Sequence, residues 1–127
     1  MDKTYESELE NCDLINICKT IGKKWSLPIL YSFSDETIQP YGAILKKFNK
    51  KINHTLLSKR LISFQKIKLI EKIPEKGYKL TPFGKKIIEL NEEMKEAAVK
   101  EGLNVPQKCR KRKCCCSDFF ENLFKKL

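Results

Sequence analysis

Apolar residues in the first third of the chain recur at helical spacing and predict two short helices. Residues 11–22 place leucine and isoleucine side chains close to one face, and Gly22 follows as a natural C-terminal stop. Residues 24–34 form the second segment, in which Ser26 is expected to be the N-cap and Pro28 falls in the first turn. A turn with a short extended piece is expected before the next helix.

The next two segments predict a pair of helices joined by a tight turn. Apolar residues at i, i+3, i+4 and i+7 indicate a helix over 41–49. Asn53 is a suitable N-cap for a helix over 54–67. The inward stripe of that helix is expected to consist of Leu57, Leu61 and Phe64.

A β-hairpin and a long helix are predicted after this pair. Residues 69–73 and 78–81 have the pattern of two strands separated by a very short connection. Pro82, at the first helical position after Thr81, begins a helix that ends near Glu101. A last short amphipathic helix with a capping-box spacing is predicted over 117–127.

This order of elements predicts a mainly α fold with a small β-hairpin (α+β), the winged helix-turn-helix. In that fold the second helix of the pair enters the major groove of DNA, and the hairpin reaches the neighbouring backbone. We expect residues 1–103 to form this DNA-binding domain with terminal dimerisation helices. Residues 104–127 are expected to form a basic, cysteine-rich linker and the short C-terminal helix.

The distribution of charge favours double-stranded DNA as the partner. The chain carries a net charge of +10, and residues 41–86 alone hold 13 basic and 2 acidic side chains. A basic block inside a folded segment is the electrostatic footprint of a nucleic-acid binder. A well-solvated lysine-rich surface is the plainer alternative, and an anionic membrane is a weaker one.

The helix over 54–67 is predicted to read the DNA. Its outward face offers hydroxyls, a lysine able to meet guanine and an apolar side chain able to meet a thymine methyl. These outward residues are Thr55, Ser58, Lys59, Ile62 and Lys66. His54, at the start of the helix, is placed to donate to a phosphate. The alternative is a solvent-facing helix whose polar residues contact nothing specific.

Lysines around this helix are predicted to neutralise phosphates, which supplies most of the affinity of DNA-binding proteins. Those that flank the helix pair are Lys46, Lys47, Lys50 and Lys51. Those on or beside the hairpin are Lys72, Lys76 and Lys79, and Lys76 is the candidate wing tip.

Three motifs carry a family resemblance. "CDLINICKTIGKKWSLPIL" (12–30) places Cys12 thirteen positions before Trp25, and "INHTLLSKRLISFQKIKLIEK" (52–72) and "YKLTPFGKKI" (78–87) follow in order. Together they resemble the HxlR-type transcription regulators. The resemblance implies a dimeric winged-helix DNA-binding regulator in which the first and last helices pair the two subunits.

The resemblance also implies specific roles and shows two departures. In some members the N-terminal cysteine senses electrophiles or oxidants, a role that corresponds to Cys12. Lys68 stands where the family usually has glycine, and the wing at 74–77 is shorter than in the family, which argues against minor-groove contacts. Trp25 is expected to anchor the core.

A homodimer would place two symmetric reading helices on successive major grooves and predicts a pseudo-palindromic operator. Candidate dimer contacts are apolar residues of the first and last helices, namely Leu14, Ile17, Phe119, Phe120, Leu123 and Phe124.

The tail segment "QKCRKRKCCC" (107–116) leaves three interpretations open. Its thiols are Cys109, Cys114, Cys115 and Cys116, and their basic neighbours favour the reactive thiolate. They could form disulfides or sense oxidants, bind zinc or another soft metal, or belong to a basic arm without further function. Cys18 is expected to be a small core residue, and Cys12 to be the more exposed thiol.

The sequence gives less support to other classes of function. The chain has one histidine, no glycine-rich phosphate loop and no Cys-x-x-Cys pair, so an enzyme is not expected. No membrane-spanning run and no secretory signal are present, which predicts a cytoplasmic protein. We therefore predict a sequence-specific DNA-binding transcription regulator, modulated by thiol redox state or metal. The alternatives are a winged-helix protein-interaction module and a non-specific, chromatin-like DNA binder.

Overall fold

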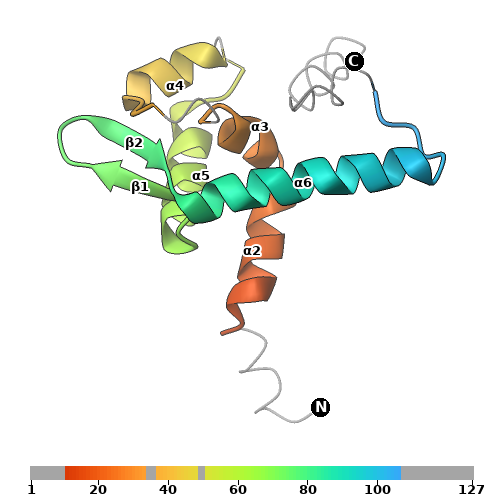
Figure 1. The fold of residues 1–127 in the computed structure, drawn as a ribbon. Helices are drawn as coiled ribbons and strands as arrows, with labels where there is room; N and C mark the ends of the chain where they lie inside the picture. The colour runs from red at the N-terminus through yellow and green to blue at the C-terminus, as the bar shows by residue number, and fades with distance from the viewer. Residues whose placement is uncertain (1–10, 34–36, 49–50, 107–127) are drawn as a thin grey trace.

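The helices and strands follow the predicted order and form a winged helix-turn-helix (Figure 1). The computed structural model describes residues 11–33, 37–48 and 51–106. Its elements are α2 (Asp13–Ile21), α3 (Ser26–Tyr31), α4 (Tyr41–Lys47), α5 (His54–Lys66), β1 (Ile70–Ile73), β2 (Gly77–Leu80) and α6 (Pro82–Lys100). The predicted fold class, mainly α with a small β-hairpin, is confirmed. The helix predicted over 117–127 lies outside the described residues.

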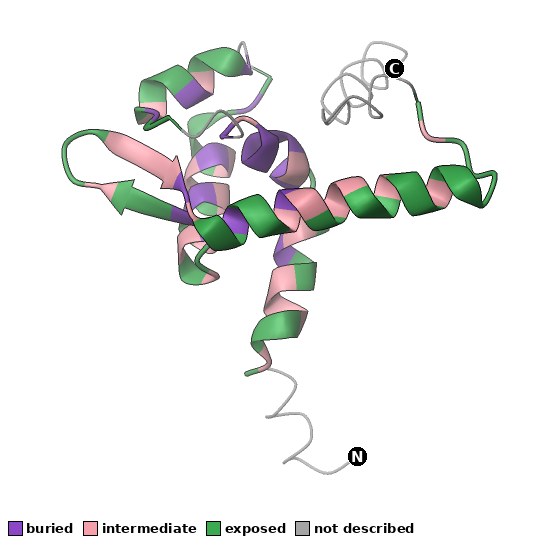
Figure 2. Cartoon of the chain, in the orientation of Figure 1, coloured by how far each residue is buried: buried purple, intermediate pink, exposed green. Residues whose placement is uncertain are grey.

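The core lies where α3, α4, α5 and the base of the hairpin meet, and Figure 2 shows buried residues gathered there. Leu57, Leu61 and Phe64 of α5 are fully buried, as predicted for its inward stripe. Trp25 is buried as well, and its ring meets Phe48 edge-on at a centroid distance of 6.2 Å, which confirms its role as a core anchor.

Two helices extend away from this core. In α2 the only buried residue is Thr20, near its end, and in α6 only Gly84 and Ile88 are buried. The outer part of α6 is tied to α3 through Asn91, whose side-chain nitrogen donates to the Tyr31 hydroxyl at 2.8 Å. We call α2 and α6 the two arms, because each extends beyond the core and has a long face that the core does not cover (Figure 1).

Side chains cap two helices as the sequence predicts. The Asn53 side-chain oxygen accepts from the backbone N–H of Leu56 at 2.8 Å and caps α5. Thr81 caps α6 by accepting from the N–H of Gly84 at 3.0 Å. These caps satisfy backbone donors that a helix start otherwise leaves unpaired.

The predicted N-cap of α3 is wrong. Trp25, not Ser26, occupies that position, with a left-handed backbone (φ 72°), and Ser26 is the first helical residue. The reason is tertiary: burying the Trp25 ring against Phe48 fixes the backbone of the preceding turn, and Ser26 is drawn into the core.

The expectations for the two N-terminal cysteines are also wrong. Cys18 is exposed and Cys12 is half-buried, the reverse of the predicted order. The spacing correctly predicted an amphipathic helix, but α2 contacts the core mainly near its C-terminal end. Cys18 therefore lies at the surface of the described structure.

The hairpin is antiparallel and pairs Ile70 with Leu80 at its base and Ile73 with Gly77 at its tip. Gly77 belongs to β2 rather than to the turn, and it has φ 131°, a backbone conformation that favours glycine. Gln39 adds an antiparallel bridge to Tyr78, with an N–H···O distance of 2.8 Å in both directions. A side chain at Gly77 would collide with the Gln39 carbonyl.

The junction between α5 and β1 explains why the resembled family usually has glycine at position 68. Lys68 has φ 63°, a left-handed conformation that costs a non-glycine residue about 1–2 kcal/mol. The Thr81 hydroxyl donates to the carbonyls of Lys68 at 2.6 Å and Leu69 at 3.0 Å. This contact holds the strained residue in place and closes the base of the hairpin.

We predict that Gly84→Ala destabilises the fold by about 1–3 kcal/mol, because an added Cβ would lie 2.1 Å from the Leu69 carbonyl oxygen. Gly42→Ala is the matched control, since a Cβ there meets nothing within 4 Å and alanine favours helix by up to about 1 kcal/mol. Urea unfolding of both variants measures the difference. Equal stability of the two variants would show that the start of α6 shifts freely.

Candidate nucleic-acid interface

The outward face of α5 forms a row of exposed side chains. Thr55, Lys59, Ile62 and Lys66 are exposed, and Ser58 between them is half-buried. Ile62 is an aliphatic side chain that is 52% exposed, because the inner face of α5 already fills the core. The helix therefore presents hydroxyl, ammonium and methyl groups in one line, the mixture that base edges in the major groove require.

At the start of α5 the structure brings together three side chains that the sequence separates. The hydroxyl of Tyr41, the first residue of α4, lies 3.3 Å from His54 Nδ1 and 3.1 Å from Ser58 Oγ. It also donates to the His54 carbonyl at 3.0 Å, and the two rings stack at a centroid distance of 5.8 Å. In the sequence, Tyr41 is the first of the apolar positions that predict the helix over 41–49, and this pattern gives no sign of its polar role.

Arg60 is the one basic residue of α5 outside the predicted set, and it faces inward. Its Nε donates to the Lys24 carbonyl at 3.0 Å, which ties α5 to the loop before α3. Burial lowers the pKa of the Arg60 guanidinium, although it stays protonated at neutral pH. Arg60 thus fixes the orientation of the reading helix rather than extending the outward row.

The lysines beside the helix pair lie at the surface. Lys46 and Lys47, at the end of α4, and Lys51, before α5, are exposed, whereas Lys50 lies outside the described residues. Lys47 Nζ donates to the Ser32 carbonyl at 2.9 Å, so its position is fixed relative to α3.

The lysines of the wing do not share one face. In the hairpin register Lys72 pairs with Tyr78 and Lys79 pairs with Glu71, so the two lysines lie on opposite faces. Lys72 and Lys76 are exposed, whereas Lys79 is half-buried and lies opposite a carboxylate. Lys76, in the three-residue turn, remains the candidate wing tip, and Lys79 is the weakest phosphate candidate of the three.

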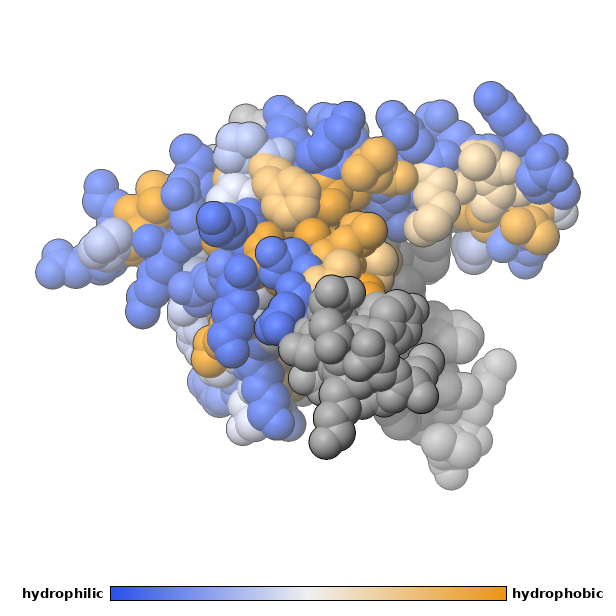
Figure 3. Space-filling model, turned by 90° about the horizontal axis from the view of Figure 1, so that it is seen from below, coloured by the Kyte–Doolittle hydropathy of each residue, from blue (hydrophilic) through white to orange (hydrophobic). Residues whose placement is uncertain are grey.

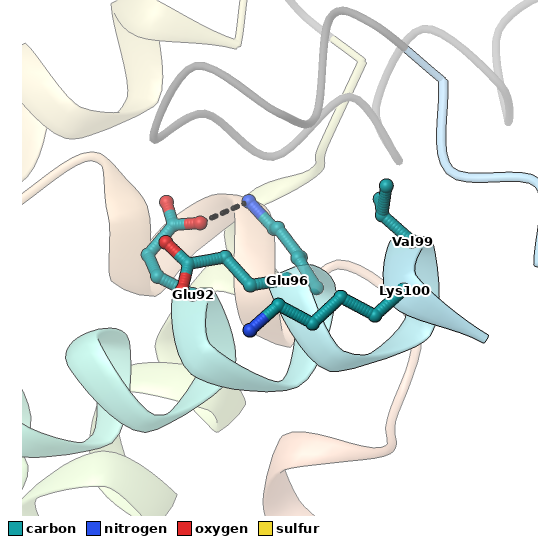
Figure 4. Close-up of a pocket in the computed structure, with 5 residues that line it drawn as sticks. Glu92, Glu96, Val99 and Lys100 are labelled. Carbon is teal, nitrogen blue, oxygen red and sulfur yellow. Dashed lines mark ion pairs between the residues drawn. The ribbon is translucent and has the colours of Figure 1, made fainter. Parts of the chain in front are cut away.

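Two cavities of the described region lie along α6 and at the end of α5. A cavity of about 310 Å³ runs along α6 between charged side chains of both signs, with Glu92 and Lys95 paired at 3.0 Å (Figure 4). A second cavity of about 230 Å³ lies between α2, the end of α5 and Phe83, and Lys66 lines it. Within residues 11–33, 37–48 and 51–106 no cluster of His, Cys, Asp or Glu could hold a metal ion. The predicted metal or redox residues Cys109, Cys114, Cys115 and Cys116 lie outside these ranges.

The two arms carry apolar residues at the surface. Seen from the side on which α2 projects, apolar side chains gather along α6 and beside α2 (Figure 3). Leu14 is 68% exposed and Met94 is 64% exposed, and Ile17, the other predicted dimer residue of α2, is half-buried. Phe119, Phe120, Leu123 and Phe124 lie outside the described residues. None of the described helices combines the length and the hydropathy that crossing a membrane requires.

The model of the HxlR-like helix-turn-helix family matches residues 20–104. The chain belongs to the HxlR-like helix-turn-helix family. No curated protein and no solved structure matches the chain significantly. Family membership confirms the resemblance drawn from the motifs, and it makes the protein a DNA-binding transcription regulator.

The HxlR-like match covers α3 to α6, including the whole helix pair and the wing. It begins after Cys12 and ends before the tail cysteines, so it assigns no role to either.

We predict that Lys59→Ala affects DNA binding, because Lys59 contacts DNA, and that Arg60→Gln affects stability, because Arg60 supports α5. Lys59→Ala should weaken DNA binding and lower the slope of log affinity against log salt by about 1, with no change in melting temperature. Arg60→Gln should lower the free energy of unfolding by about 1 kcal/mol, because the hydrogen bond from Arg60 to the Lys24 carbonyl is lost.

Electrophoretic mobility shifts over a salt series and thermal melts provide these measurements. Stronger loss of DNA affinity in Arg60→Gln than in Lys59→Ala, at unchanged stability, would place Arg60 in contact with DNA and overturn the assignment.

Proposed function

We propose that this regulator binds a specific pseudo-palindromic operator as a homodimer, with α5 in the major groove. The observation that carries the proposal is the outward row of α5, in which exposed hydroxyl, ammonium and apolar groups alternate along one face. The lysines around the helix pair and on the wing supply phosphate contacts. Thr55, Ser58, Lys59 and Ile62 are the proposed base-reading residues, with His54 and Lys66 at the two ends.

The homodimer is supported by the two arms. The side chains of Phe83, Leu90 and Met94 on α6 are each at least 40% exposed, and at 100° per residue they follow one face of the helix. Leu14 and Ile17 add apolar surface on α2. A contiguous apolar face of this kind indicates a protein–protein contact, and a second copy with the same face satisfies a symmetric interface.

Two other functions make different predictions. A protein-interaction module would bind no duplex preferentially, even at low salt. A non-specific, chromatin-like binder would coat any duplex with a steep salt dependence and leave no footprint. The apolar Ile62 in the reading row favours a specific function, because an aliphatic side chain adds nothing to phosphate binding.

Selection from a random duplex pool tests the proposal. We expect the purified protein to enrich a sequence with two inverted half-sites about one helical turn apart, about 10 base pairs centre to centre. Nuclease footprinting of the selected duplex should protect both half-sites. Binding without sequence preference, or a single unpaired half-site, contradicts the proposal.

The dimer is tested with Met94→Glu, which places a charge on the apolar face of α6. We expect this variant to sediment as a monomer and to bind the selected operator at least about tenfold more weakly. Lys100→Gln is the matched control, since it changes the formal charge by the same amount about 120° around the helix. A dimeric Met94→Glu protein would show that α6 does not form the interface.

We further propose that oxidation of the tail thiols modulates operator binding. The support is the sequence alone: the basic run Arg110–Lys113 stands between Cys109 and Cys114–Cys116, and cationic neighbours promote thiolate reactivity. Zinc or another soft metal at the same thiols is the competing proposal.

We expect oxidation to change operator affinity, and serine at Cys109 and Cys114–Cys116 to abolish the change. Cys18→Ser, which alters an exposed thiol of α2, is the control that should keep it. Metal analysis of protein purified without reducing agent distinguishes zinc binding from thiol redox chemistry. Equal affinity of reduced, oxidised and substituted protein contradicts redox control.

A further inference from the structure

We propose that Tyr41 is a positioning residue that makes Ser58 a hydrogen-bond acceptor toward DNA. The reading helix then selects, at one position of each half-site, a base with an amino group in the major groove, adenine or cytosine. This inference rests on the proposed operator binding, and it names a determinant of specificity that lies outside α5.

Three hydrogen-bonding groups of α5 surround the hydroxyl of Tyr41. Tyr41 Oη lies 3.0 Å from the His54 carbonyl oxygen, 3.1 Å from Ser58 Oγ and 3.3 Å from His54 Nδ1. The stacking of the Tyr41 ring on the imidazole, at an interplanar angle of 18°, holds the phenol in this position. Tyr41 is the first residue of α4, so the contact also fixes the two helices of the pair against each other.

Counting protons sets the direction of each bond. A phenol has one proton, and a carbonyl oxygen can only accept, so the Tyr41 proton goes to the His54 carbonyl. The Tyr41 oxygen then accepts from the Ser58 hydroxyl and from the N–H of His54 Nδ1. Ser58 has therefore used its only proton inside the protein, and only its lone pairs remain for DNA.

This direction matters because a serine hydroxyl by itself does not discriminate between bases. It donates to guanine O6 or thymine O4 as readily as it accepts from adenine N6 or cytosine N4. In a helix a free serine hydroxyl commonly donates to the carbonyl four residues earlier, which here is the His54 carbonyl that Tyr41 occupies. Tyr41 thus prevents Ser58 from donating to DNA, so guanine O6 and thymine O4 have no hydrogen-bond donor at this position.

His54 is placed by the same contact. Its Nδ1 is directed to Tyr41, and its Nε2 has no hydrogen-bond partner within the described part of the chain. His54 is exposed at the first turn of α5, where backbone N–H groups already favour an anion. A phosphate bound to these backbone N–H groups anchors the helix while Ser58 reads the base.

Random-duplex selection with four proteins tests the inference: wild type, Ser58→Ala, Tyr41→Phe and Tyr31→Phe. We expect the wild type to enrich adenine or cytosine at one position of each half-site, about threefold to tenfold over guanine and thymine. Ser58→Ala should lose this preference, and Tyr41→Phe should relax it toward all four bases. Tyr31→Phe, which removes a hydroxyl of α3 that is bonded to Asn91 of α6, should keep it.

A base analogue provides a readout that does not depend on the folding of Tyr41→Phe. If the selected base is adenine, replacing it by purine deletes only the amino group. If it is cytosine, 2-pyrimidinone does the same. This deletion should weaken wild-type binding about threefold to tenfold and leave Ser58→Ala unaffected.

Three outcomes overturn the inference while leaving operator binding intact. These are a guanine or thymine at the Ser58-dependent position, an unchanged preference in folded Tyr41→Phe, and equal sensitivity of wild type and Ser58→Ala to the missing amino group. Failure of the wild type to select any sequence is a different result, because it overturns the proposed function itself.

Discussion

Burial of the inner face of α5 is the interaction on which the rest of the structure depends. Leu57, Leu61 and Phe64 are no more than 1% exposed, and residues from α3, α4 and the hairpin base complete the core around them. Because a helix that buries one face must display the other, this packing puts Thr55, Lys59 and Ile62 at the surface in a fixed row. The reading surface is thus a consequence of core packing.

Both ends of α5 are fixed by contacts with residues distant in sequence. At the N-terminal end, Asn53 caps the helix and Tyr41 binds its first turn. At the C-terminal end, Thr81 closes the junction at Lys68. A reading helix held at both ends loses little conformational freedom on binding DNA, which favours affinity and discrimination.

Within the described residues, the small core buries little of the two arms, α2 and α6. The described part of α2 contributes Thr20 as its buried residue, and the outer part of α6 is held by Tyr31 and Asn91. Burial raises the pKa of the Tyr31 phenol, against the opposing effect of the Asn91 hydrogen bond. In the proposed dimer, these long and partly apolar arms would set the distance between the two copies of α5 and hence the spacing of the half-sites.

The sequence by itself determined the identity and order of the elements, because helical and strand periodicity and the caps at Asn53 and Thr81 are local properties. It also determined which face of α5 points outward, and the motifs identified the family. Only the tertiary structure decided the contacts that depend on distant residues. Burial of Trp25 displaced the expected cap at Ser26, and packing of α2 near its C-terminal end left Cys18 exposed. The hairpin register separated Lys72 from Lys79, and the fold brought Tyr41 to His54 and Ser58. No periodicity encodes such contacts, since they arise only when separate elements pack together.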